Sequence, residues 1–125
     1  MSERPVRVRS HRDLIVWQRA MELMVEVHRL IPRMPSAHAS TLRDQLSRSV
    51  SSVAANIAEG AGRLHRGDYL RFISIARGSL METATHVEIA VKLGYLRRDD
   101  VARVEALSAE VLKMLTKLGK VLRDR

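Results

Sequence analysis

Apolar residues recur at spacings of three and four almost from end to end of the chain. No stretch alternates apolar and polar residues in the two-residue rhythm of a half-buried strand, so the pattern predicts an all-α fold. Four helices are expected over about 13–31, 41–59, 67–93 and 99–123. Because the links between them are short, the simplest topology is an antiparallel up-down four-helix bundle over 13–125, preceded by a basic N-terminal arm over 1–12.

Residues that stop or start helices stand at the predicted ends: Pro32 and Pro35, Gly60 and Gly62, Gly94 as a left-handed cap, and Asp99 and Asp100. The buried stripe of the first helix is expected to be Leu14, Trp17, Met21, Met24, Val27 and Ile31. The stripe of the second helix is expected to be Leu42, Leu46, Ser49, Val50, Val53 and Ile57. The third helix should bury Ile73, Ala76, Leu80, Ala84, Val87 and Val91.

The third helix has a second apolar face, formed by Phe72, Ile75, Ser79, Ile89 and Leu93. One bundle interior cannot easily bury two faces of a peripheral helix, so Phe72, Ile75, Ile89 and Leu93 are predicted to form an oligomer interface. The alternative is a wide core stripe on a tilted helix. Gly78 costs about 1 kcal/mol relative to alanine in mid-helix, a cost that a closely passing neighbouring backbone would explain.

The composition fits one globular domain, because 46% of the 125 residues are hydrophobic and 29% are charged. Cysteine is absent, which excludes disulfides, thiol nucleophiles and thiolate metal sites and fits a reducing cytoplasm. The longest uncharged stretch, 49–58, is about half of the ~20 residues that a membrane-spanning helix needs. We therefore expect a cytoplasmic protein without a membrane span or a cleaved signal.

The charge balance points to a polyanionic partner, because 22 Lys and Arg stand against 14 acids, giving a net charge of +8. Two groups of cations stand out as candidate nucleic-acid contacts: the arm with Arg4, Arg7, Arg9 and Arg12, and a stripe on the fourth helix with Lys113, Lys117, Lys120 and Arg123. The alternative for the stripe is an ordinary solvated face. Aromatic residues make up 3% of the chain, so binding is expected through phosphates rather than by base stacking.

Signals for metal binding and catalysis are weak. The five histidines are scattered without the spacing that directs two imidazoles at one ion, and neither a metal nor a cofactor is expected. Arg48, Asn56, Glu59, Ser79 and Glu82 lie beside the apolar faces, where we expect a structural polar network in which Arg48 pairs with Glu59 or Glu82. Glu59 and Glu82 also admit interpretation as an acid–base pair, but the absence of a nucleophile or substrate loop favours a non-enzyme without a small-molecule substrate.

Several motifs resemble those of one known family: DLIVWQRA at 13–20, QLSR at 45–48, NIAEG at 56–60, FISIARGSLME at 72–82 and LGYL at 93–96. The family consists of four-helix-bundle proteins encoded in intervening sequences of bacterial 23S rRNA genes. The resemblance implies a homopentamer without known enzymatic activity. It also implies a relationship to the accessory variability proteins of diversity-generating retroelements, which bind nucleic acid and a reverse transcriptase. Arg48, Asn56, Glu59, Ser79 and Glu82 match the motifs of the family.

Two functional hypotheses follow. The first is a non-enzymatic, basic, homo-oligomeric bundle that binds structured RNA or DNA mainly through phosphate contacts. The second is a protein-interaction scaffold, such as an accessory subunit of a reverse transcriptase in a diversity-generating retroelement. The neighbourhood of the gene discriminates between them, because a reverse transcriptase gene beside a variable repeat favours the second hypothesis.

Overall fold

The computed structural model describes residues 10–124 and confirms the all-α prediction, with four α-helices and no strand among these residues. The helices are α1 (Ile15–Leu30), α2 (Ser40–Ala61), α3 (Arg66–Lys92) and α4 (Ala102–Asp124). Short 3-10 helices at His11–Asp13, Ile31–Arg33 and Arg98–Val101 precede α1, follow α1 and precede α4. No helix in this part of the chain is both long and apolar enough to cross a bilayer.

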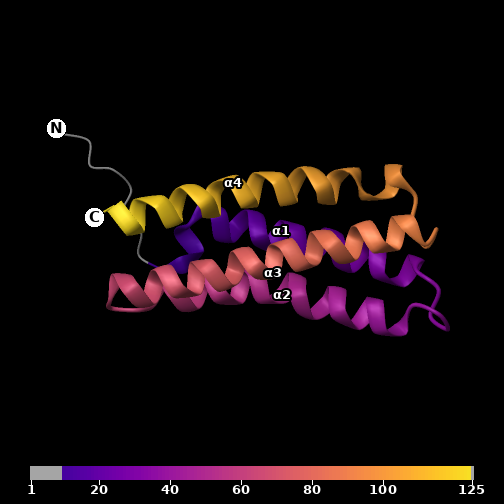
Figure 1. Ribbon diagram of the computed structural model, residues 1–125, viewed down its shortest axis with the longest axis horizontal. Coiled ribbons are helices and arrows are strands. Elements are labelled where there is room, and N and C mark those ends of the chain that lie inside the picture. The colour runs from indigo at the N-terminus through magenta and orange to yellow at the C-terminus, as the bar shows by residue number, and fades with distance from the viewer. Residues whose placement is uncertain (1–9, 125) are drawn as a thin grey trace.

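The four helices lie side by side along the long axis of the molecule (Figure 1). α1 packs against α2 and α4, and α3 also packs against α2 and α4, so the core lies between all four helices. The α2–α3 contact is the most extensive of the four. Figure 1 shows the α1–α2 and α3–α4 links at one end, and the α2–α3 link together with the C-terminal end of α4 at the other.

The buried stripe of α2 is the predicted one, from Leu42 to Ile57. In α3 the predicted stripe is right at Ile73, Ala76, Leu80 and Val87, while Thr83 and Ala90 are buried in place of Ala84 and Val91. Both exceptions lie one residue away on the helix, so the predicted face is rotated slightly from the real one.

The predicted stripe of α1 is displaced from the most deeply buried one: Val27 is buried as predicted, and the other predicted residues pack against the core only partly buried. The buried residues are Val16, Ala20, Leu23, Val27 and Leu30. Trp17, Met21 and Met24 are only partly buried, and they line a shallow groove beside small residues of α2 such as Ala54 and Ala58. These long side chains therefore cover the edge of the α1–α2 contact.

The ends of the helices show which glycines have a conformational role. Gly94 follows α3 with a φ of 78°, as predicted for a left-handed cap. Gly60, in contrast, does not end α2, which continues to Ala61. A Cβ at position 60 would lie 3.0 Å from Phe72 Cβ, so Gly60 permits close approach of α2 and α3. A Cβ at Gly78 would have no described atom within 4 Å, so no backbone of the same protomer passes close to it.

The N-terminal boundary and the start of α4 also differ from the prediction. Ser10 caps the 3-10 helix His11–Asp13, so the last residues of the expected arm are folded. Arg4, Arg7 and Arg9 lie outside the described residues. The Asp100 carboxylate accepts the Arg97 backbone N–H at 2.9 Å, and α4 begins only at Ala102 because Arg98–Val101 form a tighter turn.

Candidate nucleic-acid interface

The predicted cationic stripe lies on the exposed side of α4. Lys113, Lys117, Lys120 and Arg123 are all exposed. The three lysines lie opposite the buried residues Val111, Leu115 and Gly119, whereas Arg123 follows Gly119 by one turn and lies at the edge of the contact with α3. None of the four cations forms an ion pair with a carboxylate among residues 10–124. Their charges are therefore not neutralised locally and remain available to an anionic partner.

Other arginines are engaged by carboxylates. The guanidinium of Arg98 donates two hydrogen bonds of 2.8 Å to Glu88, and these bonds hold the pKa of Glu88 below its usual value. Arg19 lies 2.8 Å from Glu22 and 3.0 Å from Glu110. These pairs are largely exposed and add little stability, but they neutralise cations outside the stripe.

The first half of α3 adds cations that the sequence interpretation missed. Arg66, Arg71 and Arg77 are exposed and have no ion pair with a described carboxylate. Arg71 covers the ring of Phe72, with its guanidinium carbon 4.5 Å from the ring centroid. This half of α3 packs against the C-terminal half of α4, where Arg77 and Arg123 line the same hollow, a combination that spacing along α4 alone did not reveal.

Of the predicted arm, Arg12 is the arginine that can be placed. It is exposed, and its backbone carbonyl accepts a 2.8 Å hydrogen bond from Gln18 Nε2. The start of the described chain lies at the same end of the molecule as the C-terminal end of α4 (Figure 1).

The predicted pairings of Arg48 are wrong. Arg48 Nε lies 3.2 Å from Asp44 on its own helix. Glu59 pairs with Arg63 at 3.1 Å, and Glu82 lies 3.6 Å from His86. Each of these side chains pairs with a neighbour one helical turn away, because such a pair forms on the surface and does not require a charge to be buried between two helices.

A polar network does join α2 to α3, but hydroxyl groups form it. Ser52 Oγ and Ser79 Oγ are 2.8 Å apart, and Asn56 Nδ2 donates to Ser52 Oγ at 2.8 Å. Deeper in the core, Thr83 Oγ1 donates to Ser49 Oγ at 2.9 Å. Asn56 and Ser79 were predicted members, whereas Thr83 was missed. The signal that identifies the network is the three- and four-residue spacing of small polar residues on both helices.

The buried part of this network should matter for stability. Thr83→Val keeps the shape of the side chain but leaves the buried Ser49 hydroxyl without its donor, and should lower the free energy of unfolding by about 1–2 kcal/mol. Thr85→Val is the matched control, because the Thr85 hydroxyl donates to Met81 O on an exposed surface. Urea denaturation measures both. Equal unfolding midpoints for the two variants would contradict a stabilising network.

The side chains around the network are engaged with partners in the same protomer. No group of three or more His, Asp or Glu residues suited to a metal ion occurs in the part of the chain that the structure describes. Ser52, Asn56 and Ser79 bond one another, and Glu59 and Glu82 have separate partners. The arrangement can align α2 with α3.

Three residues of the second apolar face of α3 are left exposed by the protomer. Ile75 is 41% exposed, Ile89 is 37% exposed and Leu93 is 59% exposed. Phe72 is partly buried, beneath the guanidinium groups of Arg63 and Arg71. A wide core stripe on a tilted helix is therefore wrong as an account of Ile75, Ile89 and Leu93.

These features define a basic, all-α protein with four helices. The family model described as 23S rRNA-intervening sequence protein matches residues 12–117, and the chain belongs to that family. The resemblance seen in the sequence motifs is thereby confirmed. No curated protein matches the chain.

A solved structure shares the fold. It is the crystal structure of a protein with unknown function from the S23 ribosomal protein family of Bacteroides thetaiotaomicron. The two chains are 24% identical, with a TM-score of 0.78, and the match covers 85% of this chain and 99% of the other.

Proposed function

We propose that this protein is a non-enzymatic nucleic-acid-binding protein that holds structured RNA or DNA mainly through phosphate contacts. The observation that carries the proposal is the exposed stripe Lys113, Lys117, Lys120 and Arg123, without a carboxylate partner among residues 10–124. The net charge of +8 supports it, because a positive surface attracts the phosphate backbone regardless of sequence.

The aromatic side chains support phosphate contacts over base stacking. Trp17, Phe72, Tyr69 and Tyr95 are all partly buried against the protein itself. A stacking platform needs rings whose faces are open to successive bases. Binding should therefore depend on the shape and charge of the nucleic acid more than on its sequence. The description of the family refers to 23S rRNA, which makes structured RNA the first ligand to test.

A salt titration tests the proposal. The affinity for an RNA duplex should fall steeply as salt rises, with a slope of log K against log[salt] of about −3 to −4 for each protomer whose four stripe cations contact phosphates. Fluorescence anisotropy with a labelled duplex gives the affinities. A slope near zero would reject the phosphate mechanism.

We also propose that the protomers are antiparallel up-down bundles that assemble into a homo-oligomer through the second apolar face of α3. The exposure of Ile75, Ile89 and Leu93 supports this assembly, because a second copy would remove their surfaces from water. Five subunits is the number that the family resemblance implies. Assembly would multiply the cationic stripes on one particle and strengthen binding to a long polyanion.

The exposed apolar face also favours a second candidate, an accessory subunit that binds a reverse transcriptase. In that case the face is covered by another protein, and nucleic acid is a secondary ligand. A gene neighbourhood with a reverse transcriptase and a variable repeat would favour this candidate. Placement of the gene within a 23S rRNA gene would favour the first.

A further inference from the structure

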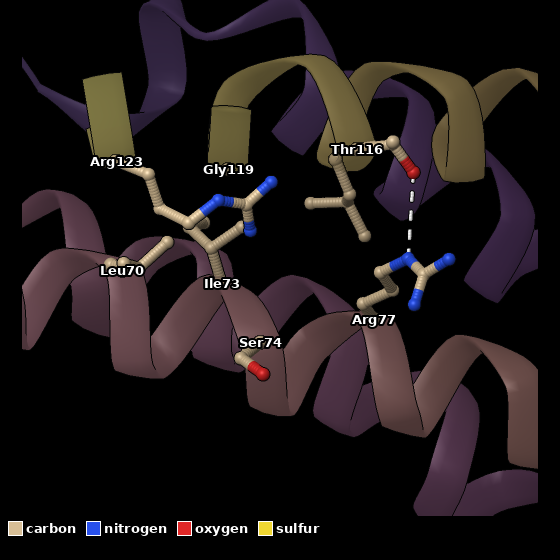
Figure 2. A pocket seen from close by; sticks show the side chains of 8 residues that line it. Leu70, Ile73, Ser74, Arg77, Thr116, Gly119 and Arg123 are labelled. Atoms are coloured by element: carbon tan, nitrogen blue, oxygen red, sulfur yellow. Dashed lines mark hydrogen bonds between the residues drawn. The ribbon is translucent and has the colours of Figure 1, made fainter. Parts of the chain in front are cut away.

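A hollow of about 280 Å³ lies between the first half of α3 and the second half of α4. Figure 2 shows Arg77 extending from α3 toward Thr116 of α4, and Arg123 on α4 at the other side of the hollow. The floor is apolar, formed by residues such as Leu70 and Ile73. The hollow therefore combines apolar side chains at its base with arginine side chains contributed by two helices.

Gly119 keeps the hollow open. It is buried near the C-terminal end of α4, and a glycine within a helix costs about 1 kcal/mol relative to alanine. A Cβ at this position would lie 3.9 Å from Arg123 Nη1 and 3.9 Å from Leu70 Cδ1, which is ordinary contact. Alanine would therefore fit, and helix packing alone does not require glycine. The missing side chain preserves the space beside the Arg123 guanidinium.

Both guanidinium groups have donors to spare. Arg77 Nε donates to Thr116 Oγ1 at 3.4 Å, and no carboxylate among residues 10–124 pairs with Arg77 or Arg123. The remaining N–H groups match the oxygens of a phosphate, which a planar guanidinium binds through two parallel hydrogen bonds.

The two arginines contact α4 at neighbouring positions. Arg77 contacts Thr116, and Arg123 lies against Gly119, three residues further along α4. The two α4 positions that they contact are separated by a rise of about 5 Å along the helix axis. Lys113 and Lys120 are three and four residues from Thr116, so they follow the same side of α4 and continue the positive surface beyond the hollow.

We infer that this hollow is a phosphate-binding site for the nucleic-acid backbone, in which Arg77 and Arg123 donate to phosphate oxygens. The hydroxyls of Ser74 and Thr116, which also line the hollow, supply further hydrogen bonds to phosphate or sugar. The inference rests on the proposed function and adds to it a defined site, with Arg77 as a contact outside the α4 stripe. Figure 2 shows Ser74 on α3, between Ile73 and Arg77.

Single substitutions test the site. Arg77→Gln and Arg123→Gln should each weaken binding of an RNA duplex at least tenfold at fixed salt. Arg43→Gln is the matched control, since Arg43 is only partly buried and has no ion pair with a described carboxylate but lies in the first turn of α2. It removes the same charge and should weaken binding less than threefold. Losses no larger for Arg77→Gln and Arg123→Gln than for Arg43→Gln would overturn the inference while leaving salt-dependent binding of the wild type intact.

NMR of the arginine Nε–Hε groups distinguishes phosphate binding in the hollow from nonspecific electrostatic binding elsewhere on the protein. Titration with an RNA dinucleotide should shift the Arg77 and Arg123 resonances saturably, and the two variants assign those resonances. Inorganic phosphate at equal ionic strength should shift the same resonances more weakly. Saturable shifts with inorganic phosphate but none with the dinucleotide would reassign the hollow to free phosphate and overturn the inference. Failure of the wild type to bind any duplex would instead overturn the proposed function.

Discussion

Replacement of Lys113, Lys117 and Lys120 by glutamate should weaken nucleic-acid binding by roughly 100-fold or more at ~0.1 M salt. The three lysines are exposed on one side of α4 and have no carboxylate partner among the described residues. Each substitution removes one phosphate contact and introduces repulsion. The salt dependence should also become shallower, because each lost contact reduces the slope of log K against log[salt] by about 0.9. Anisotropy titrations at several salt concentrations measure both effects.

A second triple variant distinguishes the effect of losing cations on the α4 stripe from the effect of lowering the net charge of the protein. Arg29, Arg48 and Arg103 are exposed and paired with carboxylates elsewhere, so their replacement by glutamate changes the net charge by the same amount. This variant should retain most of the affinity. If both triple variants lose affinity equally, binding follows net charge and the α4 stripe is not the interface. Circular dichroism of both variants checks that the helices remain folded.

Much of the fold could be predicted because helical periodicity is a local property. The stripe of α2 from Leu42 to Ile57 was correct, since apolar residues occupy only one side of that helix. In α1 the apolar residues occupy several sides, and Ile15 and Val25 are exposed. Periodicity then permits more than one face, and the packing of α1 against both α2 and α4 decides between them.

The candidate site could be predicted only where it lies on a single helix. The spacing of Lys113, Lys117 and Lys120 identified their common side of α4. The contribution of Arg77 depends on the packing of α3 against α4, which the sequence does not specify. The predicted partners of Arg48 were wrong for a related reason. Asp44 lies one turn away on the same helix and pairs with Arg48, so Arg48 needs no partner on another helix.

Replacement of Ile75 and Leu93 by glutamate should convert the proposed homo-oligomer into monomers at micromolar concentration. Both side chains are exposed on the second apolar face of α3, and burial of two carboxylates in an interface is strongly unfavourable. Light scattering should therefore give a mass near 14.2 kDa for this variant and a multiple of that mass for the wild type. The free energy of unfolding of the protomer should change little, because neither side chain belongs to the buried core.

Val25→Glu is the matched control for this assembly, because Val25 on α1 is 41% exposed, as is Ile75 on α3. It should leave the mass of the assembly unchanged.

Gly78→Ala adds a finer test, since a methyl group at position 78 meets no described atom of its own protomer. The substitution should stabilise an isolated protomer by up to about 1 kcal/mol. If a second copy packs its backbone against Gly78, the same methyl group should weaken assembly. A wild-type mass of 14.2 kDa would show that the apolar face does not bind a second copy.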